Sequence, residues 1–263
     1  MRIASSLLFL AALAATNLRA SFALRGSFLL QTVFMLVNNL TFFAIWLIFF
    51  DRFEEVGGWR LEDMATVYAV VAAGYGIAAV MAGGIQFLGQ SIVDGHLDPL
   101  LVQPRSALVQ SIGSRSNASG WGDILTGAGF LAIIARDEPA VLLLAPLAIA
   151  GSALAFGGVG VASQSLAFWA GRSSELSRQL SEFTLNFSLY PRPLFGGAVR
   201  LVLFSLLPAA FVGWLPVEAV REPGWQAALA ALTGAAGMVF LAALIFARGL
   251  KRYESGSRFG AAA

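Results

Sequence analysis

Two long stretches without a charged side chain constrain this chain more than any other feature. They cover residues 28–50 and 65–88. A helix needs about 20 mainly apolar residues to cross the hydrocarbon core of a bilayer, so each stretch is long enough. Charged residues make up 12% of the 263 residues, about half the share found in soluble domains. This composition disfavours a soluble enzyme, a nucleic-acid binder and a disordered chain, and it predicts a polytopic all-α membrane protein.

Four further apolar segments bring the number of predicted spans to six. They cover residues 121–135, 141–169, 196–214 and 225–247. The third span is short and carries Asp123 near its start. Pro208 is expected to kink the fifth span, because proline cannot donate the backbone hydrogen bond of a helix. We predict that the six spans form a single transmembrane domain over residues 1–263.

Residues 1–25 precede the first span and allow two interpretations. Arg2 followed by an apolar run resembles a short signal peptide. Alternatively, apolar residues at helical spacing form an amphipathic helix that stays at the cytoplasmic membrane surface. We favour the retained helix, because Arg19 and Arg25 flank the first span and would hold that side in the cytoplasm.

The distribution of charge predicts the orientation of the spans. Lys and Arg gather in the cytoplasmic segments of membrane proteins. With the N-terminus inside, 13 of the 17 Lys and Arg residues fall in inside segments, and 9 of the 15 Asp and Glu residues fall outside. The four outside basic residues are Arg52, Arg60, Arg136 and Arg221. We therefore predict that both termini lie in the cytoplasm.

Two long connections, residues 89–120 and 171–195, are predicted to lie inside. The second carries Leu176, Leu180 and Phe183 at helical spacing among charged residues. This pattern is typical of an amphipathic helix at the membrane surface or against a partner. A merely solvated loop helix fits the pattern equally well.

The first of these connections contains a motif. It reads Asp94-Gly95-His96-Leu97-Asp98-Pro99-Leu100-Leu101-Val102-Gln103-Pro104-Arg105. This stretch resembles the cytoplasmic motif of ABC-2-type transporter permeases, in which a Gly-Leu-x-x-Leu-Leu-x-x-Pro-like pattern follows the second span. Residues 190–195, 206–211 and 215–216 also resemble a bacterial branch of that family, often encoded as permease pairs beside a separate ATPase. Many relatives have a Glu a few residues before the Gly, whereas Asp94 directly precedes Gly95 here.

The resemblance implies a function without covalent chemistry in this chain. Two permease subunits would work with two separate ATPase subunits, which would bind ATP and Mg. No G-x-x-x-x-G-K-[ST] phosphate loop occurs in the sequence, so we expect no catalytic residue and no cofactor in the chain itself. We expect a multi-pass protein of the bacterial cytoplasmic (inner) membrane that exports its substrate, with a second permease subunit that is related rather than identical.

The motif would then form a coupling segment that sits in a groove of the ATPase. An apolar knob is expected from Leu97, Leu100 and Leu101. A polar rim of Asp94, His96, Asp98 and Arg105 would provide specificity. Pro99 and Pro104 would bound the short helical turn. The alternative is an ordinary interfacial loop whose leucines dip into lipid.

The predicted spans contain few polar side chains. Among them are Gln31, Asn38 and Asn39 on or near the first span, Gln86 on the second, Asp123 on the third and Gln164 on the fourth. Polar groups within a membrane usually hydrogen-bond between helices, so we favour that role over contact with substrate. An acid at membrane depth is also a candidate functional site. For Asp123 we favour a capping role at the positive start of its helix.

Other functions are less compatible with these residues. The chain has no cysteine and a single histidine, which excludes a Cys-ligated metal, a thiol nucleophile and a multi-His metal site. An ion-coupled secondary transporter or channel is the alternative. Such a protein is expected to have internal repeats and charged residues along its pathway, whereas this sequence shows no clear repeat and its spans contain few charges. A membrane enzyme would need clustered His, Asp or Glu. The weakly polar spans suit an amphipathic or lipid-like substrate better than a highly charged one.

Overall fold

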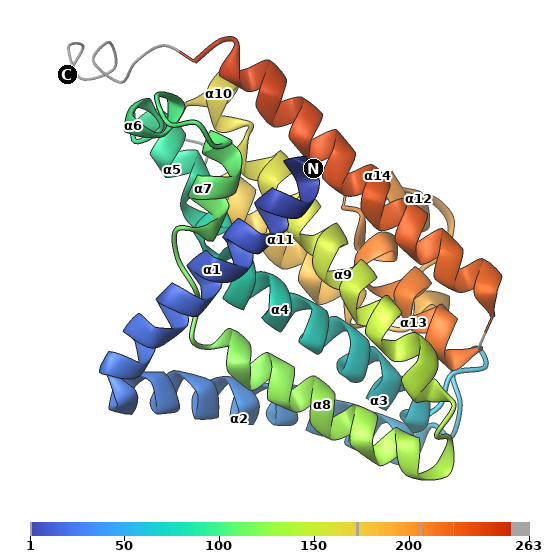
Figure 1. Cartoon of the computed structure of the whole chain (residues 1–263). Helices are drawn as coiled ribbons and strands as arrows, with labels where there is room; N and C mark the ends of the chain where they lie inside the picture. The colour runs from blue at the N-terminus through green and yellow to red at the C-terminus, as the bar shows by residue number, and fades with distance from the viewer. Residues whose placement is uncertain (1, 172–173, 206, 223, 254–263) are drawn as a thin grey trace.

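The computed structural model describes residues 2–171, 174–205, 207–222 and 224–253. Within these residues the chain is helical and forms no β-strand. Some residues within the ranges and charge counts of the sequence analysis lie outside the described ranges, namely Met1, Arg172, Leu206, Glu254 and Arg258. The helices pack into one bundle, with α1 (Arg2–Ala23) lying against its side (Figure 1).

Four helical segments of the described chain are long and apolar enough to cross a membrane. They are α2 (Arg25–Arg52), the run Leu61–Val93, the run Val141–Ala170 and α14 (Trp225–Leu250). The second run consists of α3 (Leu61–Val67), η1 (Tyr68–Ala72), α4 (Ala73–Ala82), η2 (Gly83–Phe87) and α5 (Leu88–Val93). The third consists of α9 (Val141–Gln164) and α10 (Ala167–Ala170). These segments contain four of the six spans that the sequence predicts.

The third predicted span corresponds to α8 (Gly120–Asp137). It contains three charged residues, Asp123, Arg136 and Asp137, and is less apolar than the four segments named above. It nevertheless runs beside α2 in the same direction. Gly122 packs so closely on Thr32 that a Cβ at this glycine would overlap the Thr32 carbonyl oxygen. Further along, the Phe130 and Phe43 ring centroids are 4.4 Å apart. The two helices therefore share the same depth in the bundle.

The fifth predicted span, residues 196–214, is wrong as a continuous helix. The structure has α12 (Gly197–Ser205), then η4 (Ala210–Trp214) and α13 (Leu215–Arg221). The two parts are bent by 76° at the break, where Pro208 lies. Because proline lacks the backbone N–H and its ring clashes with the preceding turn, the helix stops there, and the bend is much larger than a kink.

The structure also corrects the predicted surface position of residues 171–195. Helix α11 (Ser174–Ser188) lies lengthwise against α9, where the Ser177 hydroxyl donates to the Ser163 carbonyl at 2.7 Å. Beyond its other end, the Tyr190 ring lies 5.4 Å from the Trp46 ring, near the end of α2. Helix α11 therefore extends from the C-terminal end of α9 to that of α2.

A stripe of small hydroxyl residues explains the position of α11. Ser177, Thr184 and Ser188 are buried, and Ser181 lies on the same face. Ser181, Thr184 and Ser188 donate their hydroxyl hydrogens to carbonyls four residues earlier, so these groups are satisfied within the helix. Small side chains allow helices to approach closely within a membrane. The leucine and phenylalanine pattern pointed to the opposite face, and this is why the sequence suggested a surface helix.

The connecting segments gather at the two ends of the bundle (Figure 1). Helices α5, α10, α6 (Asp98–Leu101) and α7 (Ala107–Gly113) lie at one end, which the sequence analysis assigns to the inside. At the other end lie residues 53–60, α13 and the start of α14. The 3₁₀ turn η3 (Arg192–Leu194) also lies there, because Pro193 packs against Gly57. Arg192 therefore belongs with the residues assigned to the outside.

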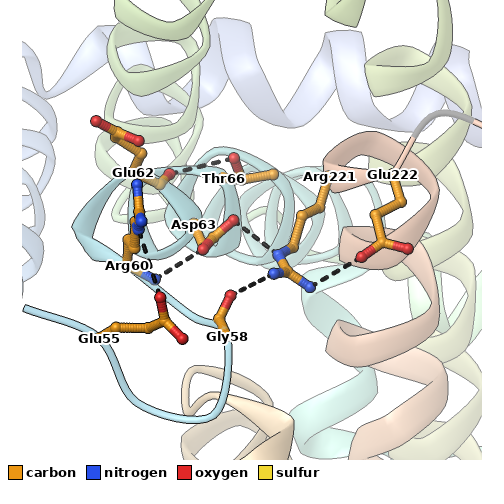
Figure 2. A network of polar contacts seen from close by, with 8 residues as sticks. All are labelled: Glu55, Gly58, Arg60, Glu62, Asp63, Thr66, Arg221 and Glu222. Carbon is orange, nitrogen blue, oxygen red and sulfur yellow. Dashed lines mark hydrogen bonds and ion pairs between the residues drawn. The ribbon is translucent and has the colours of Figure 1, made fainter.

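A cluster around Arg221 joins the bent helix pair to the start of α3 (Figure 2). The Arg221 guanidinium donates to Asp63 Oδ1 at 2.7 Å and to the Gly58 carbonyl at 2.6 Å. It also lies over the Trp59 ring, 4.8 Å from its centroid. The second Asp63 oxygen accepts the Arg60 backbone N–H at 2.7 Å. Both side chains of the Arg221–Asp63 pair are 19% exposed, so the pair is shielded from water.

We predict that Arg221→Ala lowers the stability of the detergent-solubilised protein. Removing the guanidinium leaves Asp63 without its charged partner, and a hydrogen bond to a charged group contributes about 1.5–3 kcal/mol. Thermal unfolding would measure the change. Arg60→Ala is the matched control, because the Arg60–Glu55 pair is exposed and its charges are 3.7 Å apart, which contributes less than about 1 kcal/mol. Equal Tm values for the two variants would contradict the prediction.

Candidate coupling surface and transport pathway

The predicted coupling segment forms a compact turn at the inside end. Helix α5 ends before Asp94, and Gly95 has a φ of 79°, a backbone conformation that glycine adopts without strain. The chain then folds back, because the His96 N–H donates to the Ser91 carbonyl at 2.9 Å. Helix α6 follows, with Pro99 in its first turn, where proline is tolerated. The local sequence therefore places a short helix across the end of the bundle.

The apolar residues of this segment divide into a buried and an exposed group. Leu97 is completely buried and belongs to a cluster with Leu88 and Phe246, so its predicted role as a contact for the ATPase is wrong. Leu100 packs against the same cluster and is partly buried. Leu101 is 43% exposed and Val102 is 86% exposed. Val102 was missed because the leucine pattern alone defined the expected knob.

The predicted polar rim is mostly at the surface. Asp94, His96, Pro104 and Arg105 are exposed, and Asp98 is half-buried. The exposed rim surrounds Leu101 and Val102 in the sequence, and we refer to these six exposed residues as the coupling surface. It combines an apolar centre with charged neighbours, as the binding surfaces of proteins commonly do.

Two contacts brace the coupling surface from distant parts of the chain. The Tyr253 hydroxyl, just beyond α14, donates to Asp98 Oδ1 at 2.8 Å. Burial and this hydrogen bond raise the pKa of Tyr253 to about 12. On the other side, the Arg105 guanidinium lies 4.5 Å from the centre of the Phe9 ring on α1. The segment is therefore held between the first helix and the end of the last one.

The polar residues of the predicted spans form two hydrogen-bonded sites. In the first, Asn39 of α2 donates to Asp123 Oδ1 at 2.7 Å and to the Thr126 hydroxyl at 3.3 Å. Asp123 thus bonds to a neighbouring helix, whereas the sequence analysis favoured a cap on its own helix. Asn38 is exposed and contacts the Met35 sulfur at 3.8 Å.

The second site joins α9 to the end of the second span. The Gln164 amide nitrogen donates to the Gln86 carbonyl at 3.4 Å, and its oxygen accepts the Gly89 N–H at 3.1 Å. Asn39 and Gln164 therefore have the interhelical partners that the sequence analysis favoured, whereas Asp123 was expected to cap its own helix. Gln86 takes part through its backbone rather than its side chain.

Three neighbouring cavities follow the length of α11. The one nearest the coupling surface is lined by Gln86, Gln164, Arg178 and Glu182 among others. A central cavity shares Tyr75 and Leu185 with it. The third shares residues of α2 and α11 with the central one and reaches Trp46 and Tyr190. Together they extend between the two ends of the bundle.

A charged group on α11 is exposed and borders the cavity nearest the coupling surface. Arg178 forms ion pairs with Glu175 and Glu182, and all three side chains are more than half exposed. Charged side chains at membrane depth almost always face a protein interior or a water-filled space, because exposure to lipid is costly. The sequence analysis noticed these charges but expected a helix at the membrane surface, against a partner or in a solvated loop, so their place beside the cavities was missed.

A comparison with family models gives one match. The model described as ABC-2 family transporter protein matches residues 35–257. The match begins within α2 and extends beyond α14, and it includes the coupling segment and the residues that line the three cavities. Comparisons with curated proteins and with solved structures found no match.

We predict that Asn39→Ala destabilises the protein, because it removes the donor to the buried Asp123 carboxylate. Interhelical hydrogen bonds in membranes contribute on the order of 1 kcal/mol, and an unsatisfied carboxylate adds to that loss. The control is Asn38→Ala, which removes the neighbouring, exposed amide. Thermal unfolding in detergent measures both. An Asn38→Ala variant that is as unstable as Asn39→Ala would contradict this role for the Asn39–Asp123 bond.

Proposed function

The chain belongs to the ABC-2 family of transporter proteins, and on this premise we propose that it is the transmembrane permease subunit of an ATP-binding-cassette exporter. Separate ATPase subunits bind ATP and Mg and supply the energy. This chain forms half of the translocation pathway and passes the movement of the ATPase to it. The exposed apolar centre of the coupling surface, Leu101 and Val102, is the observation that carries the proposal.

The coupling surface has the composition expected of a docking site for an ATPase. Leu101 and Val102 present their apolar side chains to solvent. Covering these side chains with a partner would make the free energy of binding more favourable. Because the segment continues through α5 into the second span, a displacement of the docked segment acts directly on that span. A partner that binds differently in its open and closed states can then shift the permease between conformations.

A second permease subunit would complete the pathway. Helix α11 carries the Arg178 ion pairs on its exposed side, and such charges are unsuited to lipid. We propose that this side of α11 faces a passage between two permease subunits. The resemblance to paired permeases favours a related rather than an identical second subunit.

In the proposed arrangement the chain crosses the bacterial cytoplasmic membrane six times. The crossings are α2, α3 to α5, α8, α9, α11 and α14. The bent pair of α12 and α13 enters the membrane from the outside and leaves it again on the outside. This follows because η3, which precedes the pair, and Arg221, which ends it, lie at the same end of the bundle. Both termini are cytoplasmic, which keeps the bias of Lys and Arg toward the inside.

An ion-coupled secondary transporter or a channel is the second candidate. Such a protein would keep ionisable groups along its pathway, and Asp123 with the Arg178 ion pairs fits that expectation in part. The exposed Leu101 and Val102 would then dip into lipid rather than contact an ATPase. The two candidates differ in whether an ATPase binds the chain.

We predict that an ATPase co-purifies with the tagged chain from native membranes in mild detergent. Leu101→Asp and Val102→Asp place a charge in the centre of the coupling surface and should reduce recovery of the ATPase at least tenfold, or about 1.4 kcal/mol of binding free energy.

The matched control for these variants is Phe53→Asp, which alters an exposed apolar residue at the opposite end of the bundle. It should leave the recovery unchanged. If no ATPase accompanies the wild-type chain, or if all three variants retain it equally, the secondary transporter becomes the better candidate.

A second experiment tests the proposed crossings. The chain has no cysteine, so single cysteines can be labelled on intact cells with a membrane-impermeant maleimide. Asp137→Cys should react, and Gln103→Cys should react only after the cells are opened. Leu194→Cys separates the proposed topology from the one expected from sequence, because η3 moves to the outside only if α11 crosses the membrane. Protection of Leu194→Cys in intact cells would refute the crossing of α11.

A further inference from the structure

The central cavity contains an acid whose hydrogen bonding is incomplete. Asp123 is 3% exposed, and its Oδ1 accepts a hydrogen bond from Asn39 at 2.7 Å. Its Oδ2 is buried and has no hydrogen-bond partner among the described residues. A buried acceptor without a donor is costly, so a donor that enters the cavity would stabilise the site.

The surroundings of Asp123 favour a positively charged donor. The carboxylate lies in the first turn of α8, where the helix dipole stabilises negative charge. None of the described residues that line the cavity is basic, so the carboxylate has no cationic partner within it. Arg178 lines only the neighbouring cavity, where Glu175 and Glu182 pair with it. The central cavity therefore carries a single negative group.

The rest of the lining suits an organic cation better than a metal ion. Tyr68 and Tyr75 contribute aromatic rings, which attract alkylammonium groups by cation–π interaction. Asn38 and Asn186 add amide groups. The remaining lining residues are apolar, namely Met35, Phe42, Ala72, Leu185 and Leu189. One carboxylate, aromatic rings and an apolar wall match a molecule with one charged nitrogen on an apolar body.

We propose that the central cavity binds an amphipathic organic monocation, with its ammonium group at Asp123 Oδ2. This inference rests on the proposed transport function and names the substrate class of the pathway. The position of the cavity fits the role, because it shares Tyr75 and Leu185 with the cavity on the coupling side and Tyr68 with the one toward Trp46. A substrate held there lies midway along α11.

The test compares two probes of the same shape on the full-length chain, purified with the subunits that accompany it. Protonated N,N-dimethylbenzylamine carries the charge and one N–H donor, and isobutylbenzene is its neutral carbon analogue. Isothermal titration calorimetry should detect at least tenfold tighter binding of the cation. Equal binding of the two probes, or no binding of the cation, would overturn the proposal without any variant.

Two matched variants locate the site. Asp123→Asn keeps the shape of the side chain and an oxygen for the Asn39 bond but removes the charge, and it should weaken binding of protonated N,N-dimethylbenzylamine at least tenfold. Asp51→Asn removes an exposed acid from the same helix as Asn39 and should leave the affinity unchanged. Unchanged binding to a folded Asp123→Asn protein would place the cation elsewhere and refute the site.

Capture of the ATPase by the same Asp123→Asn preparation separates this inference from the proposed function. Retained ATPase with lost cation binding supports both proposals. Retained ATPase in a wild-type protein that does not bind the cation refutes the substrate class alone. Absence of the ATPase from the wild type refutes the transporter assignment, whatever the probes do.

Discussion

The pairing of polar groups within a membrane is the constraint on which this structure depends. A lipid environment offers no water to satisfy an exposed hydroxyl, amide or carboxylate, so the protein must supply the partners itself. The serines and threonine of α11 meet this demand with carbonyls of their own helix and of α9. Gln164 bonds to the second span, and Asn39 bonds to α8. The same bonds fix how the helices lie beside one another.

Two exceptions to this rule lie at features that suggest transport. Asp123 keeps one oxygen unpaired beside a cavity, and the Arg178 ion pairs lie on an exposed side of α11. Neither the unpaired Asp123 oxygen nor the exposed Arg178 ion pairs are expected to stabilise the fold. At the inside end, Leu101 and Val102 are similarly exposed without a partner in the chain. These three places are where a substrate, a second subunit and an ATPase would complete the assembly.

Several parts of this arrangement could be predicted from the sequence, because they depend on local composition. Uncharged runs of sufficient length are visible without any tertiary knowledge, and four of the predicted spans appear as apolar helices. The motif around Gly95 indicated both the transporter family and a short helix after Pro99. The sequence could not separate Leu97 from Leu101, because only the packing of Leu97 against Phe246 distinguishes a buried leucine from an exposed one.

The sequence by itself determined that the chain is a helical membrane protein of the ABC-2 family, because hydrophobic length and a short motif are properties of contiguous residues. The path of α11 was decided only by tertiary structure. Its burial rests on small hydroxyl side chains that fit against α9, and such a stripe looks polar until its partner helix is known. The pairing of Asp123 with Asn39 and of Arg221 with Asp63 likewise joins residues far apart in the chain, which only the packed bundle brings within bonding distance.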